Sequence, residues 1–256
     1  MKNLLKDKVI LVAGAGGLLG SHVVKHILDQ GANVIAADIN SDKTRELLTS
    51  LSITMSDSNF ELIELDITNE ESVKALFSNI GHIDGAVNAT YPRNNTYGAH
   101  FFDVTLASFN ENLALHLGSS FLFAQQCAAY FKANNVPFSL VNISSIYGVI
   151  APDFTIYDNT PMTMPIEYAA IKSGLLHINK YISKYINNSD FRINAVSPGG
   201  IFDSQPDPFL DAYKNKTIGT GMLDVQDIVG AVLFLLSDQS KYMVGQNLIV
   251  DDGFSL

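Results

Sequence analysis

The sequence predicts a single-domain α/β fold over residues 1–256, with a mostly parallel, doubly wound seven-stranded sheet and helices on both faces. Three observations lead to this prediction. Short apolar runs alternate with longer amphipathic segments from one end of the chain to the other. Several runs are continuously apolar, which is typical of parallel strands buried on both faces. A glycine-rich turn follows the first run, and regular strand–helix alternation favours a layered, doubly wound sheet.

Each predicted strand is a short run rich in Val, Ile, Leu or Ala, bounded by polar residues or glycines. Amphipathic stretches at 22–30 and 70–78 predict helices between them. The stretch 109–133 carries apolar residues such as Leu113 and Leu117 at helical spacing and predicts a long central helix. The predicted strands are 9–13, 33–37, 61–65, 83–88, 139–143, 192–196 and 247–250.

Two stretches have no clear period. Residues 151–165 include three prolines, and residues 203–220 are also irregular. We expect both to be loops, the second with a short helix. Long irregular segments in a compact domain often contact the substrate.

The composition excludes several classes of protein. With 47% hydrophobic and 16% charged residues, the chain suits one globular domain with a buried core. A net charge of −10 without a Lys/Arg cluster argues against a nucleic-acid partner. After the first predicted strand, the longest apolar run of the sequence is 228–236. This run is too short to span a bilayer, so no membrane partner is expected. Cys127 is the only cysteine, which favours a reducing compartment and a cytoplasmic protein.

The first predicted strand runs directly into Gly14, Gly17 and Gly20, and a helix follows. Glycines allow a tight turn and let backbone N–H groups approach a diphosphate, while the helix N-terminus supplies a positive dipole end. Leu18 and Leu19 lie inside this turn and are expected to contact the same ligand. The pattern predicts a Rossmann-like dinucleotide site.

Asp38 ends the second predicted strand, eighteen residues after Gly20. An acidic residue there bonds the ribose hydroxyls of the adenosine half and repels a 2′-phosphate. This favours NAD over NADP. Lys43 and Arg45 lie nearby and keep NADP open as the alternative.

Tyr168 and Lys172 form a Tyr-x-x-x-Lys pair, one helical turn apart and therefore on one face. A free tyrosine titrates near ~10, so a tyrosine that acts as a base needs a neighbouring cation. Lys172 supplies one, and Tyr168 is the expected general acid/base. Ser145, in the preceding segment Asn142-Ile143-Ser144-Ser145, is placed to stabilise charge on a substrate oxygen.

Together these motifs resemble the short-chain dehydrogenase/reductase family over almost the whole chain. The resemblance implies a catalytic set of Ser145, Tyr168 and Lys172, with Lys172 also holding the nicotinamide ribose. It further implies a homo-oligomer, a tetramer or a dimer, built through the central helix and the helix that begins near Tyr168. The other cofactor contacts that it implies are Asp66 and Ile67 at the adenine, Asn88 and Ala89 after the fourth strand, and Pro198, Gly199 and Ile201 after the sixth.

Three positions depart from the family pattern. Leu18 replaces the usual middle glycine, so the glycine spacing looks like that of the extended, nucleotide-sugar-processing branch. His116 stands where a catalytic asparagine is usual; a proton-relay role and a buried structural role are both open, and Asn112 is a weaker candidate for the relay. The six histidines have no acidic or cysteine partners at the close spacing that is typical of metal ligands, so no metal is expected. Asp203 stands where the family often has a threonine that hydrogen-bonds the carboxamide group of the nicotinamide.

The interval between Ser145 and Tyr168 is longer than is usual in the family, and it is rich in polar and aromatic residues. With Arg93 available for a phosphate, this lining suits a sugar or sugar-nucleotide substrate. The same interval is similar to that of bacterial flagellin-modification oxidoreductases in sugar biosynthesis. We therefore expect an NAD(P)-dependent oxidoreductase that interconverts an alcohol and a ketone. An NAD-retaining sugar epimerase or dehydratase, a non-enzymatic dinucleotide sensor and a 3-oxoacyl-type reductase remain as alternatives.

Overall fold

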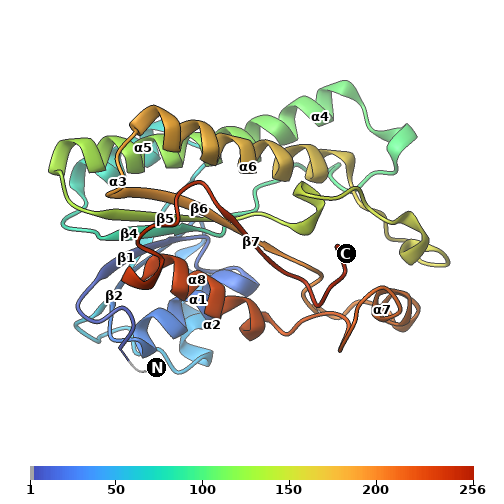
Figure 1. The fold of residues 1–256 in the computed structure, drawn as a ribbon, viewed down its shortest axis with the longest axis horizontal. Coiled ribbons are helices and arrows are strands. Elements are labelled where there is room, and N and C mark those ends of the chain that lie inside the picture. Colours follow the sequence, from blue (N-terminus) through green and yellow to red (C-terminus); the bar gives the residue numbers. More distant parts are fainter. Residues whose placement is uncertain (1–2) are drawn as a thin grey trace.

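All seven strands lie in one parallel sheet in the computed structural model, which describes residues 3–256 (Figure 1). The strands are β1 Val9–Ala13, β2 Asn33–Asp38, β3 Phe60–Glu64, β4 Gly85–Asn88, β5 Phe138–Ile143, β6 Phe191–Pro198 and β7 Asn247–Val250. Their order is β3-β2-β1-β4-β5-β6-β7. The chain thus builds outward from β1 to β3, returns to β4 beside β1, and continues to β7. This confirms the predicted doubly wound, Rossmann-like sheet; residues 1 and 2 of the predicted domain lie outside the described residues.

Helices cover both faces of the sheet. In Figure 1, α1, α2 and α8 lie below it and α3, α5 and α6 lie above it. Two apolar cores correspond to these layers, one joining the sheet to α1 and α8 and the other joining it to α3, α5 and α6. The helices are α1 Leu18–Asp29, α2 Ser41–Ser50, α3 Glu70–Asn79, α4 Leu106–Asn112, α5 Ser119–Asn134, α6 Ile166–Ile186, α7 Asp207–Lys214 and α8 Val225–Leu236.

Local sequence explains where several helices begin. Asn69 caps α3 by accepting a hydrogen bond from the backbone N–H of Ser72, and Glu70 and Glu71 suit the positive end of the helix. The predicted helix at 70–78 is confirmed. The helix predicted at 22–30 begins earlier, at Leu18, because Gly17 ends the glycine turn at the N-cap position. The first backbone N–H groups of α1 therefore directly follow the glycine turn that leaves β1.

The central helix predicted at 109–133 is not a regular α-helix throughout. The segment Leu113–Gly118 between α4 and α5 is a π-helix, so a wider turn interrupts the α-helical hydrogen bonds. Such turns are frequent at functional sites because they shift the side chains that they carry. The side chain shifted here is His116.

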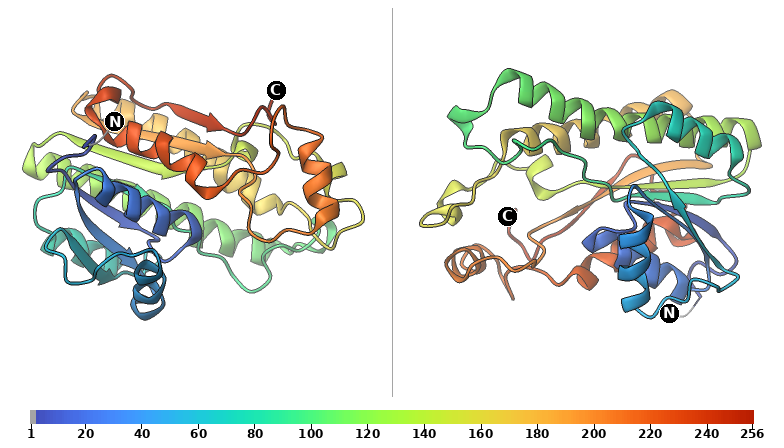
Figure 2. Two further views of the ribbon diagram at one scale, coloured as in Figure 1. Left: turned by 90° about the horizontal axis from the view of Figure 1, so that it is seen from below. Right: turned by 180° about the vertical axis from the view of Figure 1, so that it is seen from behind.

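The loops after β5 and β6 meet at one end of the molecule. Figure 2 shows α7 beside the 151–165 segment in both views, and α7 also contacts the short 3₁₀ helix Phe154–Tyr157. The short helix expected within 203–220 is therefore α7. An aromatic and aliphatic cluster joins these segments to the C-terminal residues, and its buried members are Ile146, Tyr147, Ile156, Tyr157, Phe209, Tyr213 and Phe254.

Cys127 lies on α5 in the core above the sheet and is fully buried. Burial raises the pKa of its thiol well above the usual value, so the side chain behaves as a small apolar residue. Within residues 3–256, no helix combines the length and the apolar character that crossing a bilayer requires.

Candidate active site

A pocket of about 590 Å³ opens at the carboxyl ends of β1 to β4. This edge of a doubly wound sheet is where such folds bind ligands. Of the residues predicted to contact a cofactor, Gly14, Gly17, Asp38, Asp66, Ile67 and Ala89 line this pocket. The remaining lining residues are Gly16, Ile39, Asn40, Lys43, Thr44, Leu65, Thr68, Thr90, Tyr91, Pro92, Arg93 and Leu115.

The glycines of the turn have distinct roles. Gly14 has φ +82°, and a Cβ there would lie 2.7 Å from the carbonyl carbon of Ala89. A Cβ on Gly20 would collide with the carbonyl oxygen of Gly14. Gly20 therefore brings α1 against the end of β1 and does not line the pocket. Gly16, which the sequence pattern missed, does line it.

Asp38 and Thr44 make the pocket polar at one end. The Asp38 carboxylate accepts a hydrogen bond from the backbone N–H of Gly16 at 2.8 Å. The Thr44 hydroxyl is buried and has no hydrogen-bond partner among the described residues. A glycine cradle, an α1 N-terminus without acidic residues and an unsatisfied hydroxyl fit a dinucleotide.

Lys172 lies at the centre of a second group of residues, beside this pocket. Its side chain is buried, and its Nζ donates to the carbonyl oxygen of Ile143 at 2.9 Å. Nε2 of His116 lies 3.4 Å from the same nitrogen. Burial lowers the pKa of Lys172 to about 7, because an ammonium group in this surrounding has lost most of its water.

Tyr168 and Ser145 complete this group. The Ser145 hydroxyl is hydrogen-bonded to the Tyr168 phenol and also accepts from the backbone N–H of Tyr147 at 3.2 Å. Burial raises the pKa of Tyr168, while the hydrogen bond from Ser145 acts in the opposite direction. Nζ of Lys172 lies 5.5 Å from the centre of the Tyr168 ring. The fold thus brings Ser145, Tyr168, Lys172 and His116 together from three segments.

His116 is buried and neutral near pH 7. Burial, and then the charge of Lys172, lower its pKa well below the usual value. When the Lys172 ammonium donates to Nε2, the ring proton resides on Nδ1, and this buried atom has no partner within residues 3–256. Asn112 points elsewhere: its side chain accepts from the backbone N–H of Asn94 at 3.0 Å and donates to the Ser108 carbonyl at 3.1 Å.

Tyr91 connects the pocket to the group of predicted catalytic residues, and the sequence patterns did not reveal it. Its ring meets His116 and Tyr168 edge-on, with ring centres 5.2 and 5.7 Å away. Its hydroxyl donates to the hydroxyl of Tyr97 at 2.7 Å, and burial raises the pKa of Tyr91 to about 12. Glu167, beside Tyr168, is fully buried, and both of its carboxylate oxygens lack a partner in the described chain. The only signal for Tyr91 was its position two residues after Ala89.

Several predicted residues lie outside the pocket. Leu18, Leu19, Pro198, Gly199 and Ile201 are absent from its lining. Asn88 is buried and holds the turn after β4 by accepting from the Thr90 hydroxyl at 2.7 Å. Asp203 is exposed.

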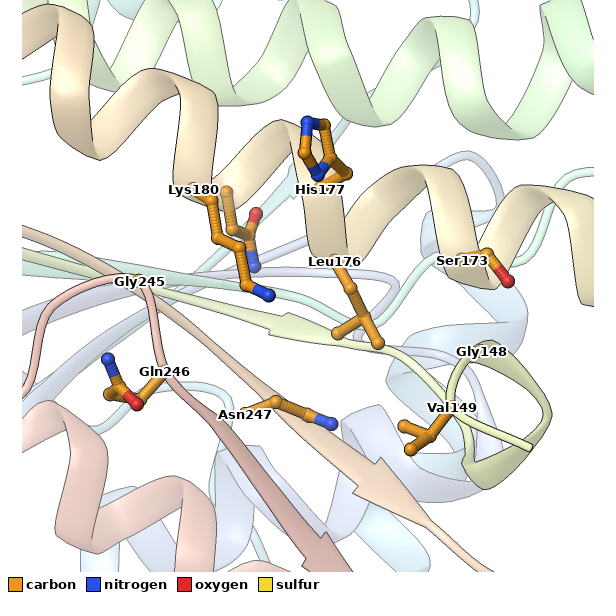
Figure 3. Close-up of a pocket in the computed structure, with 10 residues that line it drawn as sticks. Gly148, Val149, Ser173, Leu176, His177, Lys180, Gly245, Gln246 and Asn247 are labelled. Carbon is orange, nitrogen blue, oxygen red and sulfur yellow. The ribbon is translucent and has the colours of Figure 1, made fainter.

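A second pocket, of about 300 Å³, lies between α6 and the segment before β7 (Figure 3). His177 and Lys180 project from α6, while Gln246 and Asn247 belong to the facing segment. None of the four predicted catalytic residues lines it. Among residues 3–256, no group of three or more His, Cys, Asp or Glu side chains is arranged to hold a metal ion.

A family model described as enoyl-(acyl carrier protein) reductase matches residues 14–255. The post-translational flagellin modification protein A of Campylobacter coli is 38% identical over 99% of this chain and 100% of its own length. The chain belongs to the short-chain dehydrogenase/reductase family. As a member, it is an NAD(P)-dependent oxidoreductase that acts on CH–OH groups.

Other members of the family align over the same length. The 7α-hydroxysteroid dehydrogenase of Bacteroides fragilis is 27% identical over 99% of this chain and 96% of its own length. A short-chain dehydrogenase from Leptospira borgpetersenii, solved with bound NAD⁺, has a TM-score of 0.86 and 33% identity and covers 98% of this chain and 94% of its own. The family resemblance predicted from the motifs is confirmed.

Proposed function

We propose that this short-chain dehydrogenase/reductase interconverts an alcohol and a ketone on a polar, sugar-derived substrate, with NAD as the cofactor. One observation carries the proposal: Ser145, Tyr168 and Lys172 converge beside a pocket that starts at a glycine turn. We propose one NAD(P)-binding domain over residues 1–256, with cofactor contacts that include Gly14, Gly16, Asp38, Asp66 and Ala89.

The chain's own residues would move a proton and stabilise charge. When bound, the nicotinamide supplies or accepts the hydride. Tyr168 gives its phenolic proton to the substrate oxygen during reduction and takes it back during oxidation. Ser145 hydrogen-bonds the same oxygen, and the Lys172 ammonium stabilises the phenolate electrostatically.

His116 would exchange protons with Lys172. The 3.4 Å contact between Nε2 and Nζ supports this role, as does the partnerless Nδ1, which a water molecule can satisfy. Imidazole accepts a proton at one nitrogen and releases one at the other, so it can replace the asparagine that is usual in the family.

Asp38 supports NAD over NADP. Its carboxylate lies at the pocket wall, where it repels a 2′-phosphate. Lys43 in the same wall works against this preference. Titration with NAD⁺ and NADP⁺ tests it, and tighter binding of NADP⁺ would contradict it.

The substrate class rests on the loops. Asp153 and the residues around it place carboxylate, hydroxyl and aromatic groups in the 151–165 segment, which α7 contacts. The similarity to a flagellin modification protein supports a sugar-related substrate.

We further propose a homo-oligomer without nucleic-acid or membrane partners, which works in the reducing cytoplasm, where a lone cysteine stays reduced.

Replacing Tyr168 with phenylalanine tests the proposed chemistry. The variant should bind NAD⁺ with unchanged affinity and lose turnover by about 10²–10⁴-fold, the usual contribution of a general acid/base. A screen of sugars, sugar phosphates and sugar nucleotides for NADH absorbance supplies the substrate. Undiminished turnover in Tyr168→Phe would contradict the assignment, and product without net NADH would favour an epimerase or dehydratase.

A further inference from the structure

Arg93 is an unpaired cation in the wall of the cofactor pocket. Among the lining residues only Lys43 and Arg93 carry a positive charge. The Arg93 guanidinium lies 4.9 Å from the centre of the Tyr91 ring, and it makes no ion pair or hydrogen bond with any of residues 3–256. In a chain with a net charge of −10, a guanidinium held at a pocket without a carboxylate partner indicates an anionic ligand.

The segment that carries Arg93 begins against the glycine turn. The backbone of Ala89 and Thr90 lies very close to Gly14. A Cβ on Gly14 would be 2.7 Å from the carbonyl carbon of Ala89 and 2.8 Å from the backbone nitrogen of Thr90. The chain then continues through Tyr91 and Pro92, which also line the pocket. Arg93 and Gly17, the N-cap residue of α1, therefore line one pocket.

Charge along the pocket locates the anion. Asp38 and Asp66 lie where β2 and β3 end, and two carboxylates disfavour a phosphate at that place. Lys43 also lines the pocket, on the helix that directly follows Asp38. Away from these residues, the favourable positions for negative charge are the backbone N–H groups at the start of α1 and the Arg93 guanidinium. A guanidinium offers several N–H donors in one plane, which matches the oxygens of a diphosphate.

We infer that Arg93 binds the diphosphate of the dinucleotide together with the glycine turn, and that stacking on Tyr91 holds its guanidinium in place. The inference rests on the proposed NAD-dependent function and deepens it. It replaces the expectation that Arg93 binds a phosphate of the substrate. The same Tyr91 ring meets Tyr168 edge-on, so Tyr91 contacts both Arg93 and the proposed catalytic group.

Calorimetric titration of the cofactor-free protein with NAD⁺, ADP-ribose and adenosine tests the inference. Arg93→Met should weaken NAD⁺ and ADP-ribose by about 10- to 100-fold, the usual effect of a charge-assisted hydrogen bond, and leave adenosine unchanged. The affinity of Arg93→Lys for NAD⁺ and ADP-ribose should fall between that of the wild type and that of Arg93→Met, because lysine keeps the charge and loses the planar guanidinium. Arg45→Met is the matched control, since Arg45 is exposed on α2 and lies outside the pocket.

Two results would overturn the inference. One is equal affinity of wild type and Arg93→Met for NAD⁺ and ADP-ribose, including the case in which only the KM for a phosphorylated substrate rises. The other is equal weakening by Arg45→Met, which would indicate general charge attraction. If the wild type binds neither NAD⁺ nor NADP⁺, the proposed function itself fails, so the two failures are distinguishable. Thermal melting of each variant shows whether it is folded.

Discussion

Lys172 keeps an amine among buried neighbours. Its Nζ contacts the Ile143 carbonyl and the His116 ring, and its backbone carbonyl accepts from the Ser144 hydroxyl at 3.2 Å. This arrangement costs folding free energy because a cation has lost its water, and it gains a positive charge beside Tyr168. In the proposed function, placing that charge favours catalysis at the expense of stability.

The cost is measurable as a pH dependence in the cofactor-free protein. The folded pKa of Lys172 is about 7 and the ordinary value is 10.5, so between these pH values the unfolded chain binds more protons. Wild-type stability relative to Lys172→Met should therefore rise from pH 7 to 10.5, by about 1.4 kcal/mol per unit at most. Urea denaturation at several pH values measures the difference. A difference that does not change with pH would contradict the assigned burial effect.

His116 variants separate a relay from a packing role. His116→Asn restores the residue type that is usual in the family and should keep kcat within about 10-fold. His116→Leu removes both ring nitrogens and should lower kcat by about 10²-fold, with NAD⁺ affinity unchanged. Steady-state rates across pH, together with cofactor titration, make the comparison. If His116→Leu keeps wild-type kcat and pH profile, His116 is a structural residue.

Among the structural elements, the strand–turn–helix unit at residues 9–29 depends most strictly on the absence of side chains. Gly20→Ala would force a Cβ into the Gly14 carbonyl oxygen, so α1 must shift away from β1. We expect a loss of about 1–3 kcal/mol in unfolding free energy, together with weaker NAD⁺ binding.

Gly230→Ala is the matched control for Gly20→Ala. Gly230 lies inside α8, and a Cβ there has no neighbour within 4 Å. Since alanine is the better helix former, this change should stabilise the protein by about 0.5–1 kcal/mol and leave cofactor binding unchanged. Thermal denaturation of both variants decides the matter: equal melting temperatures for Gly20→Ala and wild type would show that the turn tolerates a side chain.

The elements also show how far periodicity can predict. Buried strands were predictable because β-branched runs have few other stable placements. The π-helical segment Leu113–Gly118 was not, since a shift in backbone hydrogen bonding leaves the 3.6-residue pattern of apolar side chains almost unchanged. The motifs on which the cofactor and catalytic predictions rest are readable because one short segment contains each whole pattern. Tyr91, Tyr97 and Glu167 were not, because they come together only when the chain has folded.

For the molecule as a whole, the outer surface of α5 and α6 is unusually apolar. Tyr181 and Tyr185 stack on each other and are 66% and 70% exposed, and Phe121 on α5 is 46% exposed. Exposed aromatic side chains on adjacent helices indicate a protein interface. The surface that suits the expected oligomer therefore lies on the helix that also carries Tyr168 and Lys172.

Replacing Tyr181 and Tyr185 together with glutamate should dissociate this oligomer at micromolar concentration, because the change buries two charges at the interface. Sedimentation velocity measures the mass directly. Replacing Tyr242, which is exposed in the segment before β7, with glutamate controls for added charge. An unchanged mass in the double variant would place the interface elsewhere, and a monomeric wild type would remove it.

The burial of Cys127 has a practical consequence for following motion in this protein. Since burial shields the only thiol of the sequence and raises its pKa, the native chain presents no ready target for maleimide reagents. Any cysteine introduced at the surface becomes the preferred attachment point for a spin label or a fluorophore. A pair of labels, one near Asp158 and one near Asp211 on α7, would report whether the 151–165 segment and α7 move relative to each other when dinucleotide is added.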